Sequence, residues 1–307
     1  MQHSAFQSWT PRMSRDFGEA IVKARHRLQE SQLFSDEALA ALVDKHPREL
    51  SDFCAPTHDE QGHEILPAGE IGDMSGAALV HAAHQGKLWI NLRRAMNIHP
   101  EYLELIESAF SDLRRLAPRF RPTRFSGGIL ISSPAARVPY HADKTDVILW
   151  HVRGVKRIHV YPNAQPHLRD EDMEVHMLDI ARDDLPYDAS FERSAEIYEL
   201  TPGDMLSWPL HSPHRVENVA GLNVSVTTEY SSWRSALQNG VYYTNAVLRR
   251  RFGLNPSPAA NANLAERVAK LAMARVFQKL GWGADAAEPW TPPQAEDLTG
   301  ALAPQIA

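Results

Sequence analysis

Residues 141–152 read HADKTDVILWHV and join a candidate metal-binding tripeptide to an apolar segment with the character of a strand. Because residues i and i+2 of a β-strand point to the same face, His141 and Asp143 can bind one ion from a single strand. Two histidines and one carboxylate with open coordination positions are typical of non-haem Fe(II) oxygenases. The third ligand must come from a neighbouring strand, and His214 is the candidate.

Two other residues compete for these roles. His211 lies three residues before His214 and is the alternative third ligand, although the motif around His214 favours the latter. Asp146 is the alternative carboxylate, but it is an odd number of residues from His141 and is expected to face away from it. We therefore predict that His141, Asp143 and His214 are the metal ligands and catalytic residues.

Short apolar and β-branched segments surround the tripeptide and are separated by Gly, Pro, Asn and Asp. They span residues 128–132, 146–152, 156–161, 198–200, 205–209 and 222–230. Strands of this length predict a mainly β core, either an antiparallel barrel or a double-sheet jelly roll. The last segment alternates apolar with polar residues, and its polar set includes Ser225, Thr227 and Glu229. This polar set either lines the barrel, where it would help to bind a charged co-substrate, or faces solvent.

Three linked motifs, at residues 141–143, 153–157 and 202–218, point to a known family. Because of these motifs, the stretch from about Phe125 to Tyr230 resembles the JmjC-like and cupin-like oxygenases, including the asparaginyl hydroxylase subgroup. The resemblance implies a double-stranded β-helix and a requirement for Fe(II), 2-oxoglutarate and O₂. It also implies that Lys156, fifteen residues after His141, pairs with the distal carboxylate of 2-oxoglutarate.

Two positions depart from the asparaginyl hydroxylase pattern. Val138 is apolar where those enzymes place a hydroxyl that helps to hold 2-oxoglutarate. Glu229 stands where they carry an asparagine near the metal, which favours a different substrate.

The resemblance implies hydroxylation, or demethylation if the attacked carbon is bonded to nitrogen. A protein side chain, a free amino acid and a biosynthetic intermediate all remain candidate substrates. Two other classes of cupin share such ligands: a metal-dependent isomerase or lyase, and a non-catalytic binding or regulatory protein. The spacing of Lys156 favours the oxygenase.

Residues 165–194 are an insertion between strands and carry seven acidic residues between positions 170 and 184. A loop of this length in a compact domain is usually functional or disordered. The insertion is either a lid whose charge favours a cationic substrate, or a solvated acidic face.

The sequence divides into a helical N-terminal region with strands that join the barrel (1–120), a catalytic core (121–231), C-terminal helices (232–283) and a loosely ordered tail (284–307). Ser35 predicts an N-cap for a helix over 36–45, and Pro100 opens another helix. Residues 87–92 predict a strand of the barrel. C-terminal helices at 233–251 and 261–280 are similar to those that form homodimers in the family.

Composition limits the partners. A net charge of −6 argues against nucleic-acid binding. Cys54 is the only cysteine, so no internal disulfide can form, and a reducing cytoplasm is expected. The sequence contains no apolar run of transmembrane length and no signal core, so we expect a soluble protein with no membrane partner.

Overall fold

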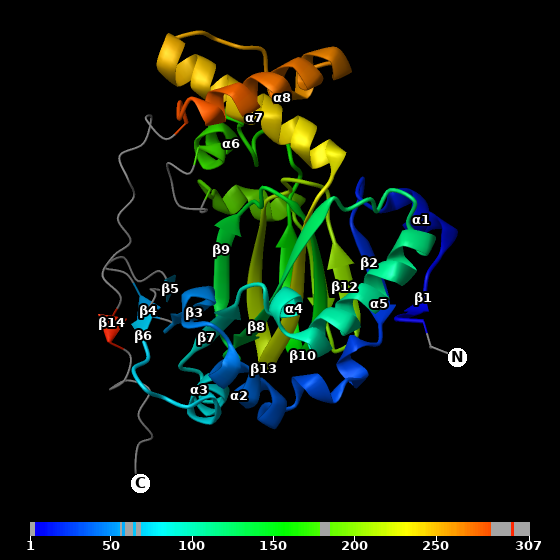
Figure 1. The fold of residues 1–307 in the computed structure, drawn as a ribbon, viewed down its shortest axis with the longest axis vertical. Helices are drawn as coiled ribbons and strands as arrows, with labels where there is room; N and C mark the ends of the chain where they lie inside the picture. The colour runs from blue at the N-terminus through cyan, green and yellow to red at the C-terminus, as the bar shows by residue number, and fades with distance from the viewer. Residues whose placement is uncertain are drawn as a thin grey trace.

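The computed structural model describes residues 4–55, 57–58, 64–65, 69–178, 185–283 and 296–297. At its centre is a ten-stranded antiparallel sheet, with helices from both ends of the chain around it (Figure 1). Its strands are β1 (Phe6–Ser8), β2 (Val22–His26), β3 (Ser51–Cys54), β7 (Trp89–Leu92), β8 (Arg124–Ser132), β9 (Arg137–His141), β10 (Asp146–Val160), β11 (Glu196–Leu200), β12 (Asp204–Ser207) and β13 (His214–Ser231).

Two small two-stranded sheets lie outside this large one. β4 (Thr57–His58) pairs with β5 (Glu64–Ile65). β6 (Gly69–Glu70) pairs in parallel with β14 (Glu296–Asp297). The rest of the tail predicted for residues 284–307 lies outside the described residues.

The long strands β10 and β13 pair along their whole length and divide the large sheet into two halves. In the wide half, the strand order is β1-β2-β12-β10-β13-β8-β7-β3, with residues 146–152 of β10 opposite the end of β13. In the narrow half, β11 and β9 flank residues 156–160 of β10 and 214–218 of β13.

The register of β10 and β13 breaks between the two halves, around Gly154. Gly154 has a φ of 79°, and a Cβ there would lie 2.7 Å from the carbonyl oxygen of Leu222. Only glycine fits this conformation without strain, so this position allows the sheet to bend.

The two halves face each other across an apolar cluster. Val147 and Leu149 come from the wide half, and Ile158 and Val160 from the narrow half, yet all four belong to one buried cluster. The other face of the wide half, which includes Trp150, packs against the N-terminal helices. This arrangement confirms the predicted double-stranded β-helix with helical additions.

The N-terminal helices are α1 (Pro11–Asp16), α2 (Asp36–Lys45), α3 (Gly76–His84), α4 (Ala95–Ile98) and α5 (Pro100–Leu116). As predicted, the Ser35 side chain caps α2 by accepting a hydrogen bond from the backbone N–H of Ala38. Pro100 is at the start of α5, and the predicted strand at 87–92 is β7, which pairs with β8.

The remaining helices lie at the opposite end of the sheet from α2 and α3 (Figure 1). They are α6 (Asp170–Met177), α7 (Trp233–Phe252) and α8 (Leu264–Lys279). A Cβ on Gly240 of α7 would lie 2.7 Å from the Cα of Leu271, so glycine permits the close approach of α8. Among the described residues, no helix has the length and hydropathy to cross a bilayer.

The predicted insertion is ordered at both of its ends. Met173 and Met177 of α6 pack with residues of α7. At the other end, the short helix η4 (Ala189–Ser194) carries Glu192, which accepts hydrogen bonds from Arg215, Tyr161 and Tyr187. These contacts attach η4 to the outer face of the narrow half, whereas residues 179–184 lie outside the described residues.

Candidate metal centre

The structure brings His141, Asp143 and His214 together at the end of the narrow half. His141 ends β9 and His214 begins β13, and the two residues are direct partners in the strand register. Asp143 lies just beyond β9, in the loop that leads to β10, rather than on the strand itself. One ligand atom from each residue lies within 4.8 Å of the other two, so the three can hold one metal ion.

Backbone carbonyls orient both histidine rings. The Nδ1 of His141 lies 2.8 Å from the carbonyl oxygen of Pro139, and the Nδ1 of His214 lies 3.1 Å from that of Ser212. A carbonyl can only accept, so each Nδ1 carries the proton and each Nε2 offers a lone pair. This is the second-shell pattern of histidines that bind metals through Nε2.

The electrostatics of the three residues also suit a cation. Burial, with a contribution from His141, holds the pKa of His214 well below its usual value, which keeps its ring neutral. Burial raises the pKa of Asp143, although the nearby His141 opposes this. A half-buried carboxylate beside two imidazole rings that each present an Nε2 lone pair is a donor set that a divalent ion would complete.

A pocket of about 340 Å³ opens beside these residues, and Glu229 lines it together with His141, Asp143 and Lys144. Glu229 is thus the member of the predicted polar set that reaches the metal centre. His176 of α6 lines the same pocket. Sequence reasoning missed His176, because no ligand spacing links the insertion to the strands.

Lys156 is buried and points into the space between the two halves. It shares a strand face with Ile158 and Val160, both of which belong to the cluster between the halves. Burial lowers the pKa of Lys156 to about 8, and no other cause contributes. Among the described residues, no hydrogen bond or ion pair involves its ammonium group, which therefore lacks an anionic partner.

The other two residues of the polar set have different surroundings. Ser225 is buried, and its hydroxyl lies 3.0 Å from Nδ1 of His151. Nε2 of His151 donates to the carbonyl of Gly154, so the proton of the ring is on Nε2 and Nδ1 accepts the hydrogen bond from Ser225. The neighbouring Lys156 contributes, after burial, to lowering the pKa of His151 to about 3. Ser225 therefore lies at the Lys156 end of the barrel, and Thr227 is half-buried between Ser225 and Glu229.

The two competing residues make other contacts. Nε2 of His211 lies 2.8 Å from Oδ1 of Asn239 on α7. Asp146 accepts a hydrogen bond from the hydroxyl of Ser232, the N-cap of α7. Neither belongs to the group of residues that can share a metal ion.

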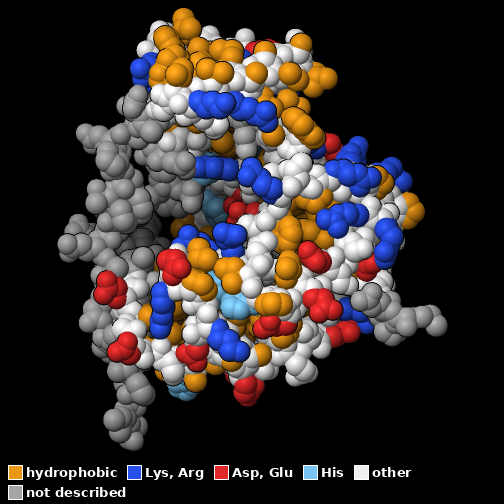
Figure 2. Space-filling view, viewed as in Figure 1, with side chains coloured by type: hydrophobic (Ala, Val, Ile, Leu, Met, Phe, Trp, Pro, Cys, Tyr) orange, Lys and Arg blue, Asp and Glu red, His pale blue; other side chains and the backbone are white. Residues whose placement is uncertain are grey.

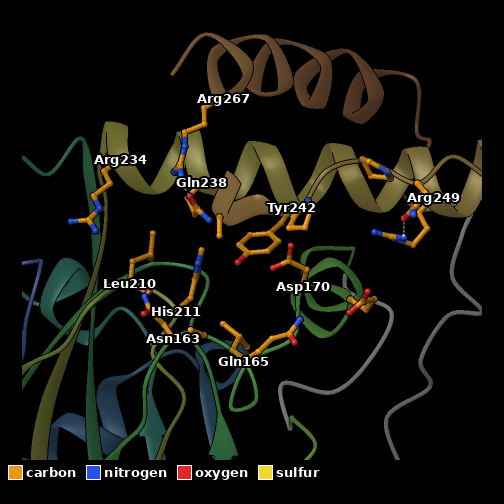
Figure 3. Close-up of a pocket in the computed structure, with 17 residues that line it drawn as sticks. Asn163, Gln165, Asp170, Leu210, His211, Arg234, Gln238, Tyr242, Arg249 and Arg267 are labelled. Atoms are coloured by element: carbon orange, nitrogen blue, oxygen red, sulfur yellow. Dashed lines mark hydrogen bonds between the residues drawn. The ribbon is translucent and has the colours of Figure 1, made fainter. Parts of the chain in front are cut away.

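A second cavity, of about 470 Å³, lies between the barrel and the C-terminal helices (Figure 3). His211 and Tyr242 line it, and their rings are 5.4 Å apart. Its charged residues include Asp170 and Arg267. His211 therefore borders this cavity, three residues before His214.

Comparison with known proteins agrees with this architecture. A model of the cupin-like domain matches residues 57–233. Among solved structures, the Escherichia coli ribosomal oxygenase YcfD in complex with cobalt and 2-oxoglutarate has a TM-score of 0.50 and 16% identity, over 95% of this chain and 76% of that chain. Another structure of E. coli YcfD has a TM-score of 0.49 and 19% identity, over 92% and 71% of the two chains.

At 16% identity, the likeness to the complex with cobalt and 2-oxoglutarate shows a shared fold. No curated protein sequence matches the chain significantly. The family match spans more than half of the 307 residues, and the chain belongs to the family of cupin-like domain proteins.

Proposed function

We propose that the protein is an Fe(II)- and 2-oxoglutarate-dependent dioxygenase that hydroxylates its substrate. The observation that carries this proposal is the pairing of a two-histidine, one-carboxylate group with an unpartnered buried lysine in the same barrel. His141, Asp143 and His214 would hold the iron. We also propose a cytoplasmic location, which the single cysteine supports.

The positions of the metal centre and Lys156 fit a short dicarboxylate between them. Val160 of β10 is opposite His214, and Lys156 is opposite Asn218. His214 and Lys156 are therefore separated along the strands by roughly 13 Å, at about 3.3 Å per residue. The lysine side chain and an extended 2-oxoglutarate can span this gap, with the keto acid at the metal and the distal carboxylate at the ammonium.

Lys156 would then bind the distal carboxylate through a charge-assisted hydrogen bond. Burial makes its charge costly in the absence of a partner, so a dianion in the barrel would relieve that cost. We propose that Ser225, behind Lys156, acts through His151 rather than on the co-substrate, because its proton is donated to that ring. When bound, iron and 2-oxoglutarate supply the oxidation of a C–H bond by O₂.

The pocket beside the metal centre is where we propose that the substrate binds. Glu229 is exposed at this pocket and is not one of the proposed metal ligands, so we propose that it pairs with a cationic group on the substrate. YcfD is described as a ribosomal oxygenase, and this description supports a protein side chain as the substrate class. Glu229 would orient that side chain, while α6, through His176, would restrict its approach.

We propose that α8 forms a homodimer interface. Its outward face carries a row of exposed apolar residues at helical spacing: Leu264, Val268, Met273, Val276 and Leu280. Figure 2 shows apolar side chains gathered at the end of the molecule where Figure 1 places α7 and α8. A second copy would cover this row, which is unusually apolar for a surface in contact with water.

The test of the function is an anaerobic titration of the Fe(II)-loaded protein with 2-oxoglutarate, monitored by its visible absorption spectrum. We expect the weak charge-transfer band of the chelate in the wild type and its loss in His214→Ala, with His167→Ala as a control. His167 lies outside the metal centre and is hydrogen-bonded to Ser194. Iron binding by the wild type without such a band would mean that 2-oxoglutarate is not chelated and would refute the proposal.

A further inference from the structure

The segment between β12 and β13 forms a tight turn that leads into His214. The backbone N–H of Ser212 donates to the carbonyl of Pro209 at 3.0 Å, and His211, the third residue of the turn, has a φ of 63°. A positive φ at this position normally requires glycine or asparagine, so histidine is strained here. The carbonyl of Ser212 in turn accepts the Nδ1 proton of His214. The conformation of the turn therefore determines where the His214 ring points.

The side chain of His211 is anchored to α7. It is buried, and its Nε2 donates to Oδ1 of Asn239 at 2.8 Å. Burial is the main cause that lowers the pKa of His211 to about 4, so the ring is neutral near pH 7 and has a single proton to donate. Its ring also packs edge-on against Tyr242, a second residue of α7. These contacts offset the strain of the positive φ.

The same Asn239 also reaches the other ligand-bearing segment. Its Nδ2 donates to the carbonyl of Lys144 at 2.7 Å, and Lys144 directly follows Asp143. One side-chain amide thus joins the turn before His214 to the peptide after Asp143. Because its acceptor and its donor are both used, the amide has one favoured orientation.

We propose that Asn239 is a positioning residue for the metal centre, which sets the relative placement of Asp143 and His214 from outside the barrel. The inference rests on the proposed function, since it assumes that these residues bind a metal ion. Removing a group that orients a metal ligand typically lowers the metal affinity 10–100-fold. The C-terminal helices would then complete the metal centre in addition to any role in assembly.

The experiment measures Co(II) binding by the full-length protein, with the visible absorption of bound Co(II) as the readout. Asn239→Leu keeps the side-chain size and removes both hydrogen bonds. The matched control is Asn245→Leu on the same helix. Asn245 is fully buried and donates to the carbonyl of Ser257, in the linker before α8, at 3.1 Å. Thermal unfolding of the metal-free variants reports their stability separately.

We expect Asn239→Leu to weaken Co(II) binding about 10-fold or more and to change the Co(II) spectrum. Asn245→Leu should lower the melting temperature yet keep the Co(II) affinity within about twofold. Unchanged Co(II) affinity and spectrum in folded Asn239→Leu would overturn the inference while leaving the metal centre intact. Failure of the wild type to bind Co(II) would overturn both the inference and the proposed function.

A double-mutant cycle with His211→Asn tests the route through the turn. Asparagine tolerates the positive φ at position 211 but is too short to reproduce the contact of the imidazole with α7. If Asn239 acts through His211, the double variant should have about the same Co(II) affinity as the single variant that binds Co(II) less tightly. Fully additive losses would contradict the route through His211.

Discussion

The wide and narrow halves of the large sheet are built from the same two strands, β10 and β13, but different interactions hold them. In the wide half, Trp150 and Val226 are fully buried in an apolar core beneath the N-terminal helices. In the narrow half, Lys156 and His214 point inward, and Arg215 binds Glu192 on the outer face.

The difference shows how one pair of strands can combine a scaffold with a site. Buried charged and imidazole groups contribute little net stability and cost much when unpaired. We expect the apolar wide half to supply the stability that allows the narrow half to keep such groups, because β10 and β13 run through both halves. Three predictions test this division, in order of expected size.

The largest effect should follow a change in the wide half. Trp150 is fully buried, packs against Phe6 and His26, and donates from Nε1 to Thr228. Trp150→Ala should lower the free energy of unfolding by about 3–5 kcal/mol, measured by urea denaturation of the metal-free protein.

The control for this change is Trp233→Ala, because Trp233 is 65% exposed. It should alter stability by no more than about 0.5 kcal/mol. If Trp150→Ala remains folded but loses more than about tenfold in Co(II) affinity, the wide half contributes to the site more directly than we propose.

The second effect concerns the charge inside the narrow half. The pKa of Lys156 is lowered by burial to about 8, so its positive charge is lost as the pH rises through that value. A bound dianion favours the charged form, so 2-oxoglutarate affinity should fall by up to about tenfold per pH unit above pH 8. Anaerobic calorimetry of the Co(II)-loaded protein at pH 7–9 measures this dependence.

Lys156→Arg provides the comparison, since arginine remains charged over this range. Its affinity for 2-oxoglutarate, whatever its value at pH 7, should change little up to pH 9. An equally flat profile for the wild type would show that Lys156 does not bind the co-substrate.

The smallest effect should come from the outer face of the narrow half. Partial burial of Glu192 opposes ionisation, but hydrogen bonds from Arg215, Tyr161 and Tyr187 lower its pKa from 4.5 to about 2. A carboxyl with a lowered folded-state pKa stabilises the fold above pH 4.5, and this stabilisation is lost as the pH falls towards 2. Glu192→Gln should therefore cost on the order of 1 kcal/mol at pH 7 and progressively less below pH 4.

Glu199→Gln is the matched control in the same half of the sheet. Glu199 pairs with Arg157, but its side chain is 54% exposed, so its loss should have almost no effect on urea denaturation. A pH-independent loss of stability in Glu192→Gln would mean that its hydrogen-bond geometry, rather than its charge, attaches η4 to the sheet.

Much of the fold follows from local patterns that the sequence displays directly. The cap at Ser35 and the proline that opens α5 act within one helical turn, so their effect is visible without the fold. The choice of barrel face for Glu229 was not visible in this way. Alternation assigns residues to one of two faces, but only the pairing with β10 and the curvature of the sheet turn one face inward.

The candidate site divides in the same manner. The chemistry of His141, Asp143 and His214, and the spacing of Lys156, were readable because ligand type and strand periodicity are local properties. His176, Asn239 and the buried His151 could not be identified as neighbours of these residues, since they come from α6, α7 and the bend of β10.

By itself, the sequence determined the fold family and the residue types of the candidate metal centre, because both depend on residue type and short spacing. Only the tertiary structure decided which polar residues share the pocket and which helix connects the two ligand segments. Those relations depend on packing between residues far apart in the chain, such as Asn239 and Lys144, and no pattern in the sequence records such distances.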